Sequence, residues 1–175
     1  MRKFAFVLIM VIFVTSMAMA AQETEKAESP WGFEVGISSA SVKSEETGKA
    51  SGYIVFEGGA NYVLEHFFFD GTFSYTKKQV DSGAKTTWMA FTLKANYRIS
   101  DGFYAGIHYG FRPAKTEHSS GHISTGTMSG PGIQLGMGII GNLAAEFTYS
   151  WGKVIQDNVP DYEVRITGIG VRYFF

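Results

Sequence analysis

The sequence of 175 residues contains no cysteine, which excludes disulfide frameworks, thiolate metal sites and a lipid anchor attached through a cysteine. It also has little net charge, because 15 Lys and Arg stand against 16 Asp and Glu for a formal charge of -1. Such a balance produces no overall field that would attract nucleic acid or an anionic substrate, so we expect no nucleic-acid partner. Beyond the N-terminal region there is no stretch of about 18 consecutive apolar residues, so a membrane-spanning helix is excluded there.

The N-terminal residues have the composition of a targeting segment. Arg2 and Lys3 precede an apolar run over residues 4–14, and the small residues Ala18 and Ala20 stand just before a polar stretch. This order is typical of a secretory signal peptide. We expect residues 1–20 to be removed by cleavage near Ala20 during export.

After residue 30 the chain alternates between apolar or aromatic residues and small or polar ones, with a period of two. This period predicts strands in which alternate side chains point to opposite faces of a sheet. Eight such segments are predicted, over residues 32–42, 52–64, 67–77, 86–99, 103–113, 130–140, 143–155 and 162–175.

The connections between these segments alternate strictly between short and long. The predicted short turns are residues 65–66, 100–102 and 141–142, and the predicted long polar loops are 43–51, 78–85, 114–129 and 156–161. Transmembrane barrels of bacterial outer membranes have an even number of antiparallel strands, short periplasmic turns and longer outer loops. The chain is therefore predicted to be all-β, an eight-stranded antiparallel transmembrane barrel with up-and-down topology. In this reading residues 21–30 are a polar periplasmic leader and residues 31–175 are the barrel.

The two faces of the predicted strands differ in a way that separates a membrane barrel from a soluble one. One face carries too many large aromatic side chains to fill a narrow interior, so we expect it to face lipid. The opposite face carries four acids and four bases among many glycines. We expect these charges to pair inside the lumen and to plug it: Glu34, Glu57, Asp70, Lys94, Arg98, Arg112, Glu146 and Arg172.

The C-terminal strand ends on Gly170, Tyr173 and a terminal Phe175, the spacing of the outer-membrane assembly signal. With this ending, residues 31–175 resemble the small outer-membrane barrels of the OmpA transmembrane domain, OmpX and Opa type. The resemblance implies location in a bacterial outer membrane and recognition of the last strand by the barrel-assembly machinery. It also implies contact with outer-membrane lipid and lipopolysaccharide.

The function expected from these features is non-enzymatic, with no catalytic residue, cofactor or metal. A plugged lumen leaves the outer loops 43–51, 78–85, 114–129 and 156–161 as the surfaces for a structural or adhesive role. Two alternatives stay open. A narrow ion or small-solute channel would use the polar lumen, and a lipid A deacylase would use a His-x-Ser arrangement, which His122 and Ser124 match.

Overall fold

The computed structural model describes residues 30–175 apart from 47, 49, 80–84, 101 and 157–158. The predicted signal peptide and leader, except Pro30, lie outside the described residues. Eight strands follow one another along the chain: β1 (Trp31–Ser44), β2 (Ala50–Leu64), β3 (Phe67–Gln79), β4 (Lys85–Ser100), β5 (Phe103–Glu117), β6 (Ile123–Ile140), β7 (Leu143–Gln156) and β8 (Val159–Phe174).

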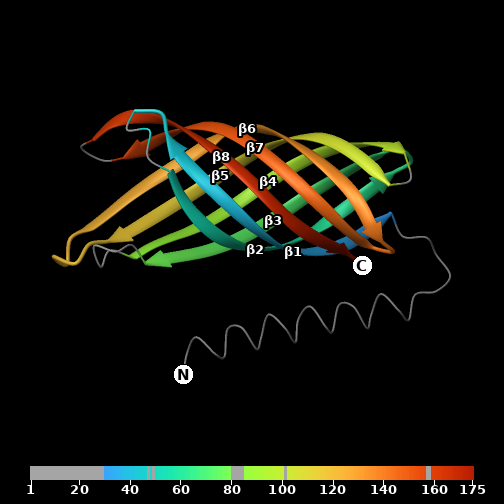
Figure 1. Ribbon diagram of the computed structural model, residues 1–175, viewed down its shortest axis with the longest axis horizontal. Coiled ribbons are helices and arrows are strands. Elements are labelled where there is room, and N and C mark those ends of the chain that lie inside the picture. The colour runs from blue at the N-terminus through green and yellow to red at the C-terminus, as the bar shows by residue number, and fades with distance from the viewer. Residues whose placement is uncertain (1–29, 47, 49, 80–84, 101, 157–158) are drawn as a thin grey trace, which may run out of the picture.

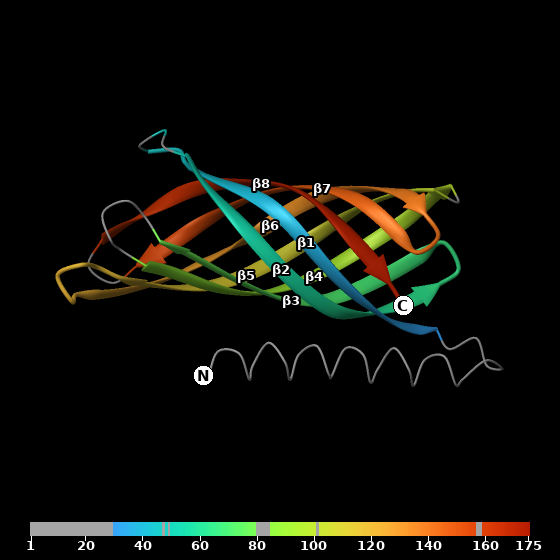
Figure 2. The same cartoon turned by 60° about the horizontal axis from the view of Figure 1, so that its bottom comes forward.

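The strands form one closed antiparallel barrel. Each strand pairs with the next in sequence, and β8 returns to pair with β1 in an unbroken register from Glu34–Phe174 to Ser44–Val164. Figure 1 and Figure 2 show the strands steeply tilted around the long axis. Closure satisfies the backbone N–H and C=O groups that an open edge would leave unpaired. The predicted fold class and strand number are confirmed. Within the described residues, no helix is long and apolar enough to cross a bilayer.

The short turns lie at the same end of the barrel as the C-terminus. Phe174 donates a backbone hydrogen bond of 3.0 Å to Asn142 in the turn between β6 and β7. A two-residue hairpin turn needs left-handed backbone, and Glu65 (φ 54°) and Gly141 (φ 52°) supply it in the turns 65–66 and 141–142. We call this the turn end and the opposite end the loop end.

The prediction of a 16-residue loop over residues 114–129 is wrong. Strands β5 and β6 continue their ladder outward as far as the pair Glu117–Ile123, which leaves only residues 118–122 as the connection. The extension is rich in Ser, Thr and Gly, so the apolar alternation that marks the inner part of each strand is missing there. Backbone pairing does not require apolar side chains once both faces of the ladder meet water.

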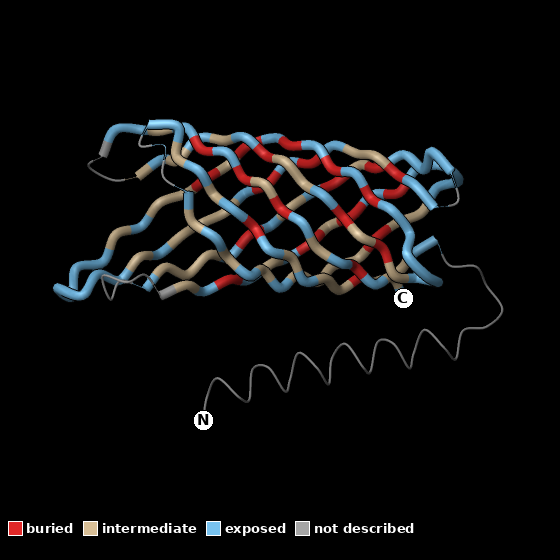
Figure 3. Tube along the Cα trace, viewed as in Figure 1, coloured by how far each residue is buried: buried red, intermediate tan, exposed pale blue. Residues whose placement is uncertain are grey.

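The two faces of the barrel reverse the arrangement of a soluble protein. Most outward side chains of the central strands are large, apolar and exposed, including Phe91 at 51% and Ile107 at 66%. Inward side chains alternate with them along every strand, and Figure 3 shows the resulting alternation of buried and exposed positions. Most buried side chains are polar or charged, with apolar ones grouped toward the two ends of the lumen. The outer surface is therefore suited to hydrocarbon and the lumen to a polar interior.

Candidate functional site

A single guanidinium lies at the centre of the lumen. Arg172 of β8 is 1% exposed, and its Nη1 donates to both carboxylate oxygens of Glu34 at 3.1 Å. The same Nη1 lies 3.4 Å from Asp70 Oδ2. Its Nη2 lies 2.5 Å from Glu146 Oε2 and 3.5 Å from Glu57 Oε1. One arginine thus links carboxylates from four other strands, β1, β2, β3 and β7.

Lys94 of β4 is the second cation of this cluster. Its Nζ lies 3.6 Å from Glu146 Oε2 and 3.8 Å from Glu57 Oε2, longer than a good hydrogen bond. The structure therefore brings together six of the eight predicted lumen charges, four acids around two bases. We call these six residues the central network: Glu34, Glu57, Asp70, Lys94, Glu146 and Arg172.

The other two predicted lumen charges, Arg98 and Arg112, stand apart from the central network, and neither forms an ion pair with a described residue. Arg98 is exposed and borders a pocket at the turn end. It lies four positions along β4 from Lys94, about 13 Å at 3.3 Å per residue, so the two cations cannot reach the same acids. Arg112 is displaced by the same length in the other direction, because it lies four positions from His108, which pairs with Lys94. The prediction that Arg98 and Arg112 pair with the lumen acids was wrong for the described residues.

Three polar side chains extend the central network. Asn96 donates to Asp70 Oδ2 at 2.8 Å, Tyr104 donates to Glu146 Oε1 at 2.9 Å, and Gln134 donates to the amide oxygen of Asn96. Asn96 and Tyr104 were missed as network members by the sequence reasoning. Their positions were available in the pattern, because Asn96 stands two residues after Lys94 and so shares its face of the strand.

Glycine makes room for the largest of these side chains. Gly136 pairs with Tyr104 across the β5–β6 ladder, and a β-carbon at position 136 would overlap the phenol ring. Gly132 stands in the same relation to His108. These close approaches place a bulky inward side chain over a bare backbone, which lets a narrow lumen hold aromatic and charged groups together.

Small clusters of apolar side chains lie in the lumen on both sides of the central network. Toward the turn end, Phe68 packs edge-on against Tyr104 at 5.0 Å between ring centroids, and Ala144 completes that cluster. Toward the loop end, Ala40, Met128, Val164 and Ile166 form a second cluster. Between these clusters Arg172, Asn96 and Gln134 are each 1% exposed, whereas the side chain of Glu57 is 18% exposed.

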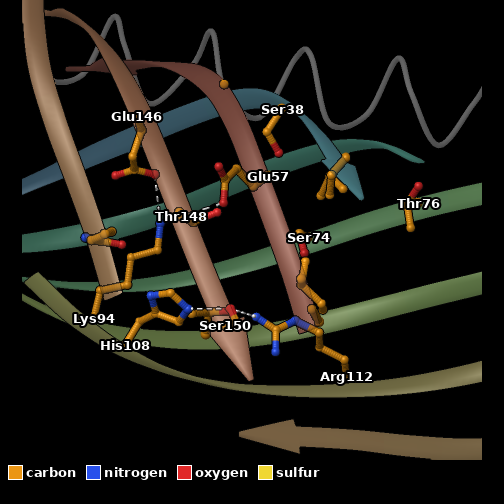
Figure 4. Close-up of a pocket in the computed structure, with 18 of the residues that line it drawn as sticks. Ser38, Glu57, Ser74, Thr76, Lys94, His108, Arg112, Glu146, Thr148 and Ser150 are labelled. Atoms are coloured by element: carbon orange, nitrogen blue, oxygen red, sulfur yellow. Dashed lines mark hydrogen bonds and ion pairs between the residues drawn. The ribbon is translucent and has the colours of Figure 1, made fainter. Parts of the chain in front are cut away.

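A small cavity of about 100 Å³, whose walls include both charged and apolar side chains, lies between the central network and the loop-end cluster. Figure 4 shows Lys94 directed at Glu146 on one side of it, and His108 and Arg112 both directed at Ser150 on the other. His108 Nε2 shares a hydrogen bond of 2.7 Å with Ser150 Oγ, to which Arg112 Nη2 donates at 3.4 Å. A cavity of this size holds a few water molecules, not a solute with several rings.

The tip of the β5–β6 hairpin carries the residues of the His-x-Ser alternative. Ser124 Oγ lies 3.0 Å from His118 Nε2, and the rings of His118 and His122 are 5.6 Å apart. Ser124 thus pairs with His118 and not with His122 of the predicted motif. Among the described residues, no group of three or more His, Asp or Glu is placed to hold a metal. The pair also stands exposed at the outer extremity of the hairpin.

Comparison with known protein families agrees with the barrel fold. The family described as outer membrane protein beta-barrel domain matches residues 6–175. No curated protein matches the chain.

Three solved structures share the fold at low sequence identity. Neisserial surface protein A has a TM-score of 0.57 at 16% identity, covering 83% of this chain and 97% of its own. The N-terminal barrel of OprF from Pseudomonas aeruginosa has a TM-score of 0.56 at 15% sequence identity. This match covers 81% of this chain and 97% of the OprF barrel. The attachment invasion locus protein Ail of Yersinia pestis has a TM-score of 0.53 at 18% sequence identity. This match covers 85% of this chain and 100% of Ail.

Proposed function

The chain belongs to the outer membrane β-barrel family, and on that premise we propose that it is a non-enzymatic surface protein of a bacterial outer membrane. In this proposal the barrel is a rigid, plugged support, and the loop end carries the structural or adhesive interactions. The loop end comprises the four outer connections and the outward extensions of the strands.

The observation that carries this proposal is the closure of the lumen. Arg172, Asn96 and Gln134 are almost fully buried at mid-barrel, and apolar clusters lie on both sides of them. Side chains that line a conducting pore are exposed to its water, and eight-stranded barrels are just wide enough for side chains to fill. A lumen that is filled at mid-barrel leaves the outer surfaces as the places where a macromolecular partner binds.

Features of the outer surface support contact with lipid and lipopolysaccharide. Aromatic side chains such as Phe103 and Tyr173 ring the turn end, while Tyr75 and Trp151 lie toward the loop end, the arrangement of two interfacial girdles. Beyond the second girdle the long side chains of Lys77 and Lys153 are exposed at the height where anionic lipid headgroups lie.

Features of the C-terminal strand support the proposal that the barrel-assembly machinery recognises it. Gly170, Tyr173 and Phe175 have the spacing of the assembly signal, and the rings of Tyr173 and Phe175 pack edge-on at 4.8 Å on the outer surface. Phe175 also donates a backbone hydrogen bond of 2.8 Å to Phe33, so the last residue is held against β1, where the barrel closes.

A lipid A deacylase fits the geometry less well. A serine nucleophile needs a histidine base that a third group orients. Here the pair His118 and Ser124 stands exposed at the hairpin tip, beyond the height of the lipid acyl chains that a deacylase must cleave. Unchanged lipid A mass in cells that produce the protein, compared with cells that do not, supports the non-enzymatic proposal.

The proposal is tested by shortening the β5–β6 hairpin. Replacement of residues 116–124 by a two-residue Asn-Gly turn removes the tip and leaves the membrane part of both strands intact. Both proteins, in lipid nanodiscs, are assayed against arrays of glycans and of extracellular-matrix proteins. We expect at least one interaction of the parent protein to be lost in the shortened variant. A parent protein that binds nothing on either array but conducts ions steadily would replace the proposal with the narrow-channel alternative.

A further inference from the structure

The loop end of the lumen holds a second cavity, about 310 Å³ in volume, which no part of the proposed function uses. We call it the outer vestibule. Its inward-facing walls include Tyr53 of β2, Trp88 of β4, Arg112 of β5, Met128 of β6, Gln156 of β7 and Tyr162 of β8. Sites for small organic ligands are concave, begin at about this volume, and combine apolar or aromatic walls with a few polar groups. The outer vestibule has each of these properties.

One wall of the outer vestibule is a pair of stacked aromatic rings. Tyr53 and Trp88 lie 4.2 Å apart between centroids with an interplanar angle of 29°, and both are half-buried. Lys78 Nζ lies 4.9 Å from the centre of the Tyr53 ring. Stacked rings are rigid and provide a flat surface at little entropic cost, which suits a ligand that is itself flat on one face.

Arg112 lies at the boundary between the outer vestibule and the central cavity, because it lines both of them. Among the described residues, its guanidinium makes one side-chain hydrogen bond, of 3.4 Å from Nη2 to Ser150 Oγ. Its Nη1 is buried and has no hydrogen-bond partner there. A guanidinium with an unused N–H edge is a donor for a carboxylate, sulfate or phosphate group.

The charge of the outer vestibule favours an anion. Its described lining residues include Arg112 and no Asp or Glu. Just outside the lining, Lys78 adds a second cation beside Tyr53, and Glu46 is an acid close enough to act electrostatically on Tyr162. The acids of the central network lie deeper: Glu57 and Glu146 line the central cavity and not the outer vestibule. Glu57 is the acid whose charge acts on Arg112 from that side, but it forms no ion pair with Arg112 among the described residues. Gln156 and the hydrogen-bonded hydroxyls of Thr86 and Thr116, 3.1 Å apart, supply neutral polar groups around the same space.

We propose that the outer vestibule binds a small organic anion of one or two rings, with its anionic group on Arg112 and its ring against Trp88. The volume excludes a polymer from the interior but accommodates an aromatic carboxylate or a single hexuronate. The outer vestibule lies on the loop side of the central network, so the ligand enters from the outer surface in this proposal. The buried side chains of the central network prevent its passage into the periplasm. Binding at this site is independent of the loop interactions proposed above.

The three tryptophans of the chain provide the measurement. Trp31 and Trp151 face outward, at 63% and 45% exposure, whereas Trp88 lies in the vestibule wall. The double variant Trp31→Phe, Trp151→Phe therefore makes Trp88 the sole tryptophan. This variant, refolded in lipid vesicles, is titrated with benzoate and glucuronate, and with their uncharged counterparts benzyl alcohol and glucose.

We expect a saturable change in Trp88 emission with at least one of the two anions, and affinity at least about tenfold lower for its uncharged counterpart. Arg112→Gln should weaken binding of that anion to a similar degree, while Arg112→Lys should retain part of it. Lys153→Gln, which removes an outward cation, is the matched control and should leave binding unchanged.

Three results would overturn the proposal. One is the absence of a saturable change with both anions in protein whose folding is verified by its shifted gel mobility before heating. The other is equal affinity for the parent and Arg112→Gln proteins, with Arg112→Lys serving as a second test if the glutamine variant does not fold. The third is equal affinity for each anion that binds and its uncharged counterpart, which would reject recognition of the negative charge.

Discussion

Arg172 and Glu146 face each other diagonally across neighbouring strands at the centre of the barrel, with 2.5 Å between Arg172 Nη2 and Glu146 Oε2. The direct register partners are Ala144 for Arg172 and Gly170 for Glu146, so each charged side chain lies beside a small residue. Diagonal neighbours on one face of an antiparallel pair are within reach of long side chains. The ion pair is thus formed by local strand geometry, and the barrel closure adds Glu34 and Asp70 to the same guanidinium.

Replacing Arg172 by methionine should lower the free energy of unfolding by about 3–5 kcal/mol, because it leaves buried carboxylates without their shared cation. Denaturant unfolding of the refolded barrel in lipid vesicles, followed by tryptophan emission, measures the change. Arg98→Met is the matched control, since Arg98 is an exposed arginine outside the central network; it should change the free energy by no more than about 0.5 kcal/mol. Equal effects of the two substitutions would contradict a structural role for the network.

A methyl group at position 136 should destabilise the barrel through overpacking against Tyr104. The expected loss for Gly136→Ala is about 1–3 kcal/mol in the free energy of unfolding. Gly52→Ala is the control, because no atom lies within 4 Å of a β-carbon built at position 52. Tyr104→Leu removes the overlapping ring. The double variant Gly136→Ala, Tyr104→Leu should therefore lose less free energy of unfolding than the sum of the losses in the two single variants. Full additivity would show that the two positions do not share this contact.

The folded protein should conduct no steady current in a planar bilayer. The physical reason is the near-complete burial of Arg172, Asn96 and Gln134 at mid-barrel, which leaves no water-filled cross-section there. Single-channel recording on protein with a verified heat-dependent gel shift makes the measurement. Reproducible openings of constant size would instead support the narrow channel.

Substitution of the terminal residue, Phe175→Ser, should reduce the amount of folded barrel in the outer membrane of cells several-fold while leaving export intact. Recognition of the terminal aromatic by the assembly machinery is the expected cause. Phe111→Ser is the matched control, because Phe111 is likewise an outward phenylalanine but lies toward the loop end, at 51% exposure against 38% for Phe175. Quantifying the heat-modifiable form in membranes distinguishes the two, and equal losses would point to lost lipid contact instead of a lost signal.

Amide hydrogen exchange should separate the outer part of β6 from the hairpin tip. The amides of residues 123–129 that bond to β5 or β7 should exchange markedly more slowly than those of residues 119–120. Mass spectrometry of the protein in nanodiscs resolves these segments. Uniformly fast exchange from residue 114 to residue 129 would instead support the long loop that the sequence predicts over this region.

Much of the fold was available from local patterns in the sequence. The period of two located all eight strands, and the turns 65–66 and 141–142 were placed at the residues where the structure has them. The outer ends of β5 and β6 could not be found this way, because Ser, Thr and Gly at positions such as Ser124 and Gly126 carry no apolar alternation. Their pairing depends on backbone hydrogen bonds to a partner strand already held in register by the barrel.

The sequence by itself determined which side chains face lipid and which face the lumen, because that choice follows from alternation along each strand. It could not determine which lumen charges meet, because every inward residue shares the same face whatever its height along the barrel axis. The stagger of eight tilted strands sets that height, and it places Lys94 beside Glu146 while leaving Arg98 and Arg112 toward opposite ends. Only the closed tertiary structure therefore decided that four carboxylates share two cations, and that one arginine remains available at the floor of the outer vestibule.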